Sequence, residues 1–427
     1  MSVNSFTSSS EPRRRAARHL AWLSGGTALL LACVACVNLL VDPYRVFGTP
    51  DLPGLSAVKP DFVEHLRLTT PYAIERARPQ ALFIGTSRVG RGLSPHHPAF
   101  EGLRTYNAAL PAVSLYEVWR TLQHADAVSP LEVVVLGLDN RMFYANPDGQ
   151  GTFSEARMAV DSAGRRQRNP FSARLPDYAA SLISTDALLS SARVVRFQGW
   201  ASLTLARNGQ WTATGNEFDA YHGFRVMTRN TFDRYHRYAS GRFDMARASE
   251  PLREILRMCH KQGIDLRMFI PPAHAWHWEA MRLMNMTARF DDIRREIVRL
   301  NAEVAAEFGA SPFPLVDFSG YAGPNAEPAP TAPGASHPWY WETVHFRPNL
   351  GDQVLDRLFG AAGVTDAGFG LSVNAELVDD HIHAWHAARA RYAAKHPEEV
   401  EEVENMHRDW LAHAGDRGAH NREEDLQ

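Results

Sequence analysis

The chain has 427 residues, of which 45% are apolar and 22% charged, a composition typical of a globular protein of about two to three domains. This composition excludes a chain disordered throughout, a collagen-like chain and a polytopic membrane protein. Lys and Arg number 45 and Asp and Glu 48, so the net charge of −3 offers no electrostatic case for nucleic-acid binding. Three cysteines are too few for a disulfide framework, so the core must hold the fold.

The N-terminal 41 residues join a basic stretch to a long apolar run. Residues 1–19 contain four arginines, whereas residues 20–41 (LAWLSGGTALLLACVACVNLLV) carry no charge. About 20 apolar residues, rising 1.5 Å each, match a hydrocarbon core of about 30 Å. Arginines before the run predict a cytoplasmic tail over 1–19, a transmembrane anchor over 20–41 and a body outside the cytoplasm. A cleaved signal peptide is the alternative, although its apolar region is ordinarily shorter.

From residue 42 to 371, short β-branched runs alternate with amphipathic stretches. This alternation predicts an α/β fold, a parallel five-stranded sheet flanked by helices in three layers. The expected strands are 81–84, 105–107, 132–138, 265–270 and 314–318. The expected helices are 114–127, 249–262, 276–308 and 348–359.

Two segments break this rhythm. Residues 141–248 are rich in Arg and aromatic residues and contain a hairpin signal at Asn208-Gly209, so we expect an insertion over the sheet. Its aromatic and basic side chains fit either a carbohydrate platform or a small core: Trp200, Trp211, Tyr221, Phe224 and Arg225. Residues 372–427 are rich in His and charge, which predicts a helical or disordered tail.

A serine follows the first predicted strand. Ser87 lies in Leu82-Phe-Ile-Gly-Thr-Ser-Arg-Val89, where the strand turns into the next segment. A serine at this turn lies at the carboxyl edge of the sheet, where open α/β folds bind ligands. It is a candidate nucleophile; a polar turn serine is the alternative.

A carboxylate and a histidine lie three residues apart at Glu342 and His345, just before the last predicted helix. In one helical turn this spacing lets the carboxylate accept from the imidazole and fix its tautomer. The imidazole would then act as general base toward a hydroxyl. A surface ion pair is the alternative.

Together these elements resemble the SGNH (GDSL-type) hydrolase superfamily, and within it the membrane-anchored proteins of bacterial envelope modification. Those proteins O-acetylate alginate-type exopolysaccharides or assist D-alanylation of teichoic acids. The matching stretches are Asp42-Pro43-Tyr44, Gly85-Thr-Ser-Arg88, Tyr106-Asn-Ala-Ala-Leu110, Val135-Leu-Gly-Leu-Asp139 and Glu342-Thr-Val-His-Phe346. The resemblance covers residues 40–140 and 250–360 and implies a flavodoxin-like fold.

The resemblance implies that Ser87 is the nucleophile, His345 the base and Glu342 the acidic member, which is usually Asp in that family. The family's oxyanion glycine corresponds to Ala112 here. Its third block, Gly-x-Asn-Asp, reads Gly137-Leu-Asp139-Asn140, with the last two residues exchanged. An amide can donate to an oxyanion, whereas an ionised carboxylate repels it.

Three more residues are candidates for oxyanion or substrate contact. Asn107 and Arg88 lie in the matching stretches, and His274 follows the fourth strand at the same sheet edge, where a capping role is the alternative. We predict no cofactor and no metal. The histidine groups lack a carboxylate or thiolate at convincing spacing: His274 and His277, and His381, His383 and His386.

The apolar run predicts an inner-membrane protein whose body lies outside the cytoplasm, and the resemblance implies that the body acts as a serine O-acyltransferase or esterase on an envelope polysaccharide. A membrane-bound O-acyltransferase is the expected partner, since acetyl-CoA is cytoplasmic. The alternative is a catalytically weak, polysaccharide-binding or scaffold subunit of an export complex.

Overall fold

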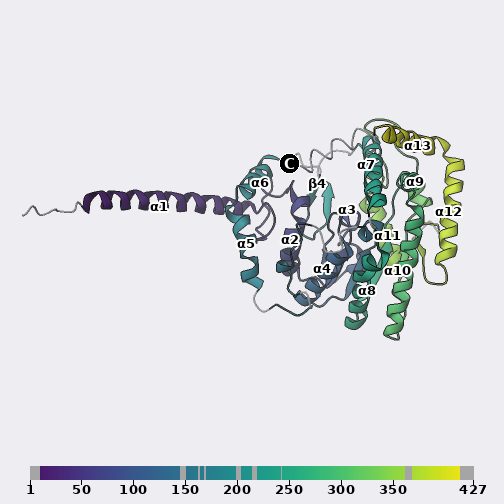
Figure 1. The fold of residues 1–427 in the computed structure, drawn as a ribbon, viewed down its shortest axis with the longest axis horizontal. Helices are drawn as coiled ribbons and strands as arrows, with labels where there is room; N and C mark the ends of the chain where they lie inside the picture. The colour runs from purple at the N-terminus through teal and green to yellow at the C-terminus, as the bar shows by residue number, and fades with distance from the viewer. Residues whose placement is uncertain are drawn as a thin grey trace, which may run out of the picture.

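The computed structural model describes residues 10–144, 151–161, 164–167, 170–198, 203–213, 219–241, 243–360 and 368–413. Helix α1 (Ser10–Val41) projects from the body as one continuous helix (Figure 1). Its residues Arg13–Val41 are long and apolar enough to cross a membrane, and no other helix in the described ranges meets that condition. The helix begins ahead of the apolar run and includes the arginines.

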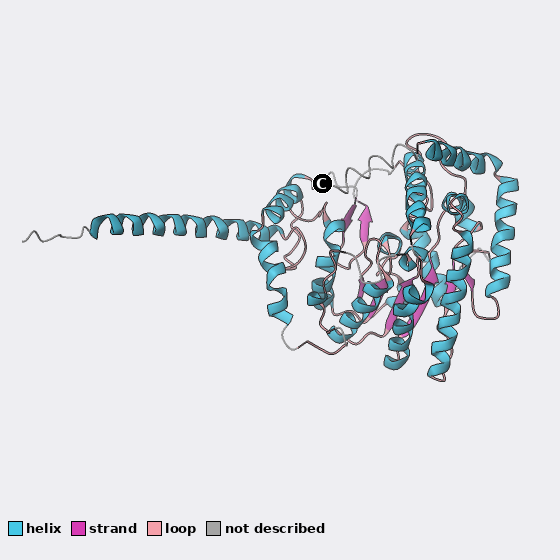
Figure 2. Ribbon diagram, viewed as in Figure 1, coloured by secondary structure: helices cyan, strands magenta, loops and turns pink. Residues whose placement is uncertain are grey.

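A mostly parallel sheet of six strands forms the centre of the body (Figure 2). In spatial order the strands are β2 (Thr105–Asn107), β1 (Ala81–Ile84), β3 (Val133–Gly137), β6 (Asp265–Ile270), β7 (Leu315–Asp317) and β8 (Leu371–Ser372). The first five are parallel, as predicted, and β8 is antiparallel to β7. The expectation of five strands missed β8 because two residues are too few to show a pattern.

Helices cover both faces of this sheet. Along β1, Leu82 and Ile84 belong to one buried apolar cluster, and Ala81 and Phe83 belong to the other. Because successive side chains of a strand point to opposite faces, both faces of β1 are covered. The first cluster includes residues of α2 (Phe62–Ala77), α4 (Leu115–Val128), α8 (Met245–Gln262) and α10 (Thr287–Glu307). The second includes residues of α3 (Ser87–Gly92), α9 (Ala275–Leu283) and α11 (Pro348–Phe359).

Of two helices predicted from local sequence signals, the structure confirms one and divides the other. The helix expected over 114–127 is α4, which Ser114 caps with Glu117 completing a capping box. The single helix expected over 276–308 is wrong, because the chain breaks between α9 and α10, where Asn285 adopts a left-handed φ of 57°. Short 3-10 turns cover Pro98–Phe100, Asn140–Phe143, Glu155–Arg157 and Gly323–Ala326.

The described parts of the segment over 141–248 form a hairpin and several helices that pack at different places on the body. The hairpin predicted at Asn208-Gly209 is confirmed, because β4 (Leu203–Leu205) pairs antiparallel with β5 (Trp211–Ala213). Helices α5 (Pro170–Ile183) and α6 (Thr185–Arg196) contact the end of α1, and α7 (Ala220–Ser240) contacts α9. Trp200 lies outside the described residues.

The C-terminal segment packs against the body. Helices α12 (Val378–Lys395) and α13 (Pro397–Ala412) contact α10, α9 and α7. Their apolar side chains are spaced at helical intervals and buried, among them Trp385, Val403 and Trp410. The described part of the predicted tail, up to residue 413, is therefore largely helical, as one of the two expectations had it, and packs on the body through its buried side chains, whereas residues 414–427 lie outside the described ranges.

Candidate active site

Ser87 is the first residue of α3, directly after the carboxyl end of β1. Thr86 caps the helix: its hydroxyl oxygen accepts from the Arg88 N–H at 3.4 Å and donates to Asp139 Oδ2 at 3.1 Å. Asp139 follows β3, the strand beside β1. The turn that carries Ser87 is thus tied to the neighbouring strand, which holds the serine at the carboxyl edge of the sheet.

His345 lies against Ser87 although 258 residues separate them in the chain. The Nε2 atom of His345 is 2.7 Å from Ser87 Oγ, and Nδ1 is in hydrogen-bond contact with Glu342 Oε1. The backbone N–H groups of Val344 and His345 also donate to the Glu342 carboxylate, at 2.7 and 3.2 Å. Among the residues predicted to be catalytic, the structure therefore brings together the hydroxyl, the imidazole and the carboxylate.

The Glu342–His345 pair lies in a turn, not in the helix that its spacing suggested. The Trp341 N–H donates to the His345 carbonyl at 2.9 Å, and Tyr340 pairs with Phe346 across the turn. Helix α11 begins only at Pro348. Like a helical turn, a turn closed by backbone hydrogen bonds brings the side chain of one residue within contact distance of the side chain three residues later, here Glu342 and His345.

Close packing of α3 on α11 brings this turn to Ser87. A Cβ added to Gly92 would lie 1.9 Å from the Phe346 ring, and one added to Gly351 would lie 1.8 Å from the Gly92 carbonyl. Such distances are far inside van der Waals contact. The two helices approach this closely because both positions lack a side chain, and Phe346 is the next residue after the histidine.

The charges around this turn favour a neutral imidazole beside a charged carboxylate. Burial lowers the pKa of His345; the Glu342 charge opposes that shift, and the nearby Arg91 and Arg88 charges add to it. Burial alone would raise the pKa of Glu342, but the His345 charge and the hydrogen bonds from His345 and Val344 leave it below its usual range. A neutral imidazole with a free lone pair toward a hydroxyl is the form that a general base needs.

Asp139 does not act as a hydrogen-bond donor. It is 1% exposed and accepts from the Thr86 hydroxyl and, at 3.1 Å, from the Arg141 N–H. Its Oδ2 lies 3.3 Å from Arg88 Nε. Burial alone would raise the pKa of Asp139, but the Arg88 and Arg141 charges outweigh it and hold that pKa below its usual range. The carboxylate is therefore ionised and serves the turn that carries Ser87, not an oxyanion.

The two asparagines also bond within the protein. Asn140 Nδ2 donates to the Tyr235 hydroxyl at 3.0 Å. Asn107 Nδ2 lies within 3.2 Å of the Val89 and Leu93 carbonyls, and Asn107 Oδ1 accepts from the Ala109 N–H at 3.1 Å. The predicted substrate contact of Asn107 is thus replaced by a role in holding the chain after α3 against β2.

Arg88 points into the protein, against the prediction that it contacts substrate. It is 2% exposed, and its Nη2 lies 3.3 Å from His277 Nε2, which also contacts the Tyr235 hydroxyl at 3.3 Å. With Asp139 and Asn140 these residues form one buried network, here called the arginine cluster. Sequence reasoning missed Tyr235 and His277 as members, because no local pattern links α7 and α9 to the strand ends.

Ala112 has a left-handed backbone with φ of 49°, the region that favours glycine. It lies in the loop after β2, where the Ala108 and Leu110 N–H groups donate to the Phe83 and Gly85 carbonyls. The loop therefore runs along the end of β1 and contacts Gly85, which lies two residues before Ser87.

His274 is a capping residue rather than a substrate contact. Its Nδ1 accepts from the Trp276 N–H at 3.3 Å, so Nε2 carries the proton that is donated to the Glu327 carbonyl at 2.7 Å. Both ring nitrogens are thus engaged, and the side chain is fully buried. In the described ranges, no group of three or more His, Cys, Asp or Glu residues could hold a metal ion.

Sequence reasoning also missed a cavity that adjoins the Glu342 turn. A cavity of about 470 Å³ is lined by residues of α3, the β4–β5 hairpin, the turn and the start of α11, including Arg91, Gln210, Trp211, Trp341 and Asn349. Arg91 Nε and Trp211 Nε1 are buried and have no hydrogen-bond partner among the described residues. Two signals were available: Trp211, which the sequence offered for a carbohydrate platform or a small core, and Arg91, which lies one turn after Ser87 on α3.

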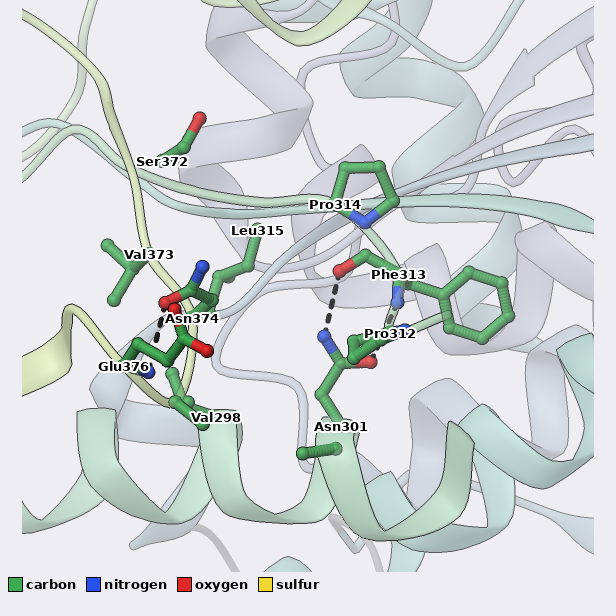
Figure 3. Close-up of a pocket in the computed structure, with 12 residues that line it drawn as sticks. Val298, Asn301, Pro312, Phe313, Pro314, Leu315, Ser372, Val373, Asn374 and Glu376 are labelled. Carbon is green, nitrogen blue, oxygen red and sulfur yellow. Dashed lines mark hydrogen bonds between the residues drawn. The ribbon is translucent and has the colours of Figure 1, made fainter. Parts of the chain in front are cut away.

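A second cavity, of about 420 Å³, lies at the other edge of the sheet (Figure 3). Pro312, Phe313 and Pro314, which line it, precede β7, whereas Ser87 follows the carboxyl end of β1. Because β1 and β7 are parallel members of one sheet, this cavity is remote from the serine edge.

Comparison with protein-family models and with curated proteins finds no match to this chain. The site therefore has to be interpreted from its own geometry.

Proposed function

We propose that the chain is a membrane-anchored, extracytoplasmic serine O-acyltransferase or esterase of the SGNH type that acts on an envelope glycan. One observation carries the proposal: the hydrogen-bonded series Ser87, His345 and Glu342 at the carboxyl edge of a parallel sheet. Acyl transfer through a serine requires a nucleophile, a base and an orienting carboxylate that contact one another.

In the proposed first step, Ser87 Oγ attacks the carbonyl carbon of an acyl ester while His345 Nε2 takes the hydroxyl proton. Glu342 stabilises the imidazolium that forms and keeps its Nδ1 proton directed to the carboxylate. The tetrahedral intermediate then expels the alkoxide of the donor, which takes the proton from Nε2. The products are the free donor alcohol and an acyl ester on Ser87.

In the second step, a sugar hydroxyl or water attacks the acyl-serine, and His345 takes its proton. Collapse of the second tetrahedral intermediate returns that proton to Ser87 Oγ and releases the new ester or the free acid. Transfer and hydrolysis differ only in the acceptor. The acyl donor would be presented by a membrane-bound O-acyltransferase, since acyl-CoA is confined to the cytoplasm.

The cavity beside the Glu342 turn supports a glycan as the acceptor. Trp341 offers indole surface and Asn349 an exposed amide, a mixture suited to the apolar face and hydroxyls of a sugar, and Trp211 and Gln210 line the cavity as buried side chains. Arg91 and Arg347 are basic, and no acidic residue is found among the described residues that line this cavity. Trp341 immediately precedes Glu342, so the cavity adjoins the turn that carries the proposed base, whereas Ser87 and His345 themselves do not line it.

A second candidate function is a catalytically weak, glycan-binding or scaffold subunit. The buried contacts of Asp139, Asn140 and Asn107 favour it, because these contacts leave no side chain of the family's oxyanion pattern directed at Ser87. An oxyanion donor is typically worth about 3–4 kcal/mol of transition-state stabilisation.

Labelling with a fluorophosphonate probe separates the two functions. The full-length chain in detergent is incubated with the probe, and adducts are mapped by mass spectrometry. We expect an adduct on Ser87 that is lost in Ser87→Ala and retained in Ser240→Ala, a matched substitution at an exposed serine. An unlabelled Ser87 in the folded chain would contradict the enzyme and leave the binding subunit.

A reporter fused after residue 60 tests the proposed orientation. The arginines ahead of the apolar run predict reporter activity outside the cytoplasm only. Activity inside the cytoplasm would contradict both the localisation and the choice of an envelope glycan.

A further inference from the structure

The last turns of α1 pack against helices α5 and α6. Asn38 is fully buried there: its Nδ2 donates to the Leu182 carbonyl at 2.9 Å, and its Oδ1 accepts from the Ser191 hydroxyl at 2.7 Å. Val34 and Ala35, one turn earlier on the same side of the helix, are half-buried. Figure 1 shows α5 and α6 at the end of the body where α1 joins it.

This contact extends into the apolar run. From Val34 to Val41 the helix rises about 10 Å, at 1.5 Å per residue. The uncharged run covers residues 20–41, so α5 and α6 lie beside its final part. If α1 crosses a bilayer, as proposed above, the two helices must sit at the depth of the headgroup–acyl boundary.

The exposed face of α5 is apolar and its charges face inward. From Ser172 onward its exposed residues are Ser172, Ala173, Leu175, Pro176, Ala179, Ala180 and Ile183, and none is charged. Arg174 is 3% exposed and pairs with Glu75 at 2.6 Å, and Asp177 pairs with Arg157 at 2.8 Å. A helix on a water-facing surface shows the reverse arrangement.

Helix α6 continues this surface with a basic end. Leu189 and Val195 are 55% and 43% exposed, and Phe197 follows the helix at 38%. Arg193 and Arg196 lie in the last turn. Large apolar side chains with arginines at their border are the composition of helices that lie in a membrane interface.

We propose that the outward faces of α5 and α6 insert into the headgroup–acyl boundary of the bilayer that α1 crosses. The body is then held at the membrane surface by the three helices α1, α5 and α6 instead of by α1 alone. Lipid is the favoured occupant because the surface is continuous with the membrane-spanning helix and lies at its depth. The inference rests on α1 crossing a bilayer and is independent of the chemistry proposed for Ser87.

Spin labels in lipid nanodiscs test this placement. Nitroxides are attached at Leu175→Cys, Ile183→Cys and Leu189→Cys in the full-length chain, with Cys33 and Cys36 replaced by Ser; Cys259 is 1% exposed and unreactive. The matched control is Leu411→Cys on α13, because Leu411 is 53% exposed and Leu175 54%. We expect the ratio of oxygen to water-soluble nickel collisions to be severalfold higher at the three sites than at residue 411.

Equal ratios at all four positions would overturn the proposal. Low collision rates for both reagents, with spin–spin broadening at 175 or 189, would overturn it in favour of a second copy of this chain. A second measurement uses the unmodified chain, so it does not depend on the folding of the variants. Carbene probes carried by lipid tails should label peptides of α5 and α6 as well as α1. Labelling of α1 alone would also overturn the proposal.

Discussion

Two polar clusters meet at adjacent residues at the start of α3. The first, here called the serine cluster, consists of Ser87, His345 and Glu342; the arginine cluster begins at Arg88. The side chain of His345 is 12% exposed and Ser87 is half-buried, whereas Arg88 and His277 are 2% and 1% exposed. The first cluster is partly exposed and the second is buried.

Both clusters contain a histidine and a carboxylate, so residue type does not distinguish them. In the serine cluster the imidazole bridges a carboxylate and a hydroxyl. In the arginine cluster His277 Nε2 meets Arg88 and Tyr235, and Nδ1 has no partner among the described residues. Burial and then the Arg88 charge hold the pKa of His277 well below its ordinary value, so it is a neutral acceptor rather than a base for chemistry. The difference shows that access, not composition, marks the candidate site.

The largest expected effect distinguishes the two histidines by the same substitution. His345→Ala should slow labelling of Ser87 by about 10⁴-fold, because the general base is lost, with little change in stability. His277→Ala should instead lower the free energy of unfolding by roughly 2–5 kcal/mol, as expected for a large buried side chain. Probe labelling and urea unfolding of both variants check this, and exchanged outcomes would reverse the roles given to the clusters.

The next effect concerns the carboxylate of the arginine cluster. Asp139→Asn leaves Arg88 buried without its counter-charge and should cost about 3–5 kcal/mol of stability. Because the folded-state pKa of Asp139 is depressed, its contribution is present above the pKa of the unfolded carboxyl and is lost as pH falls through the folded pKa. Unfolding at neutral and acid pH should therefore show a difference between variant and wild type that shrinks in acid. If Asp139→Asn instead raised the esterase activity and left the stability unchanged, position 139 would be shown to serve the oxyanion.

A smaller effect concerns the pH profile of the serine cluster. Labelling of Ser87 needs neutral His345, so its rate should rise with pH through the pKa of His345 and then level off. Glu342 raises that pKa and Arg91 lowers it. Glu342→Gln should therefore move the acid limb to lower pH, and Arg91→Gln should move it to higher pH. Shifts in the same direction would contradict the charge arrangement described for the turn.

The smallest effect is expected at Ala112, whose left-handed backbone costs about 1–2 kcal/mol for a residue with a side chain. Ala112→Gly removes that cost but gives the unfolded chain more freedom, worth about 0.4–1 kcal/mol. We expect a net gain of about 1 kcal/mol or less in the free energy of unfolding, measured by urea titration. A loss would show that the alanine methyl group makes contacts that outweigh the strain.

By itself, the sequence determined the elements whose signals are local. The five parallel strands, the capping box at Ser114 and the hairpin at Asn208-Gly209 follow from burial patterns, cap chemistry and turn chemistry, which depend on residues a few positions apart. The apolar run of α1 is equally local. The spacing of Glu342 and His345 predicted their contact, although a turn and not a helix makes it.

Only the tertiary structure decided which polar residues face the serine and which serve the core. Arg88, Asn107, Asp139 and His274 lie at the right sheet edge by sequence, yet each has partners from distant segments that bury it. The inward charges of α5 are equally invisible to a local pattern, because Glu75 and Arg157 reach them from other parts of the chain. Partner choice depends on which elements pack together, and a single strand or helix carries no record of its neighbours.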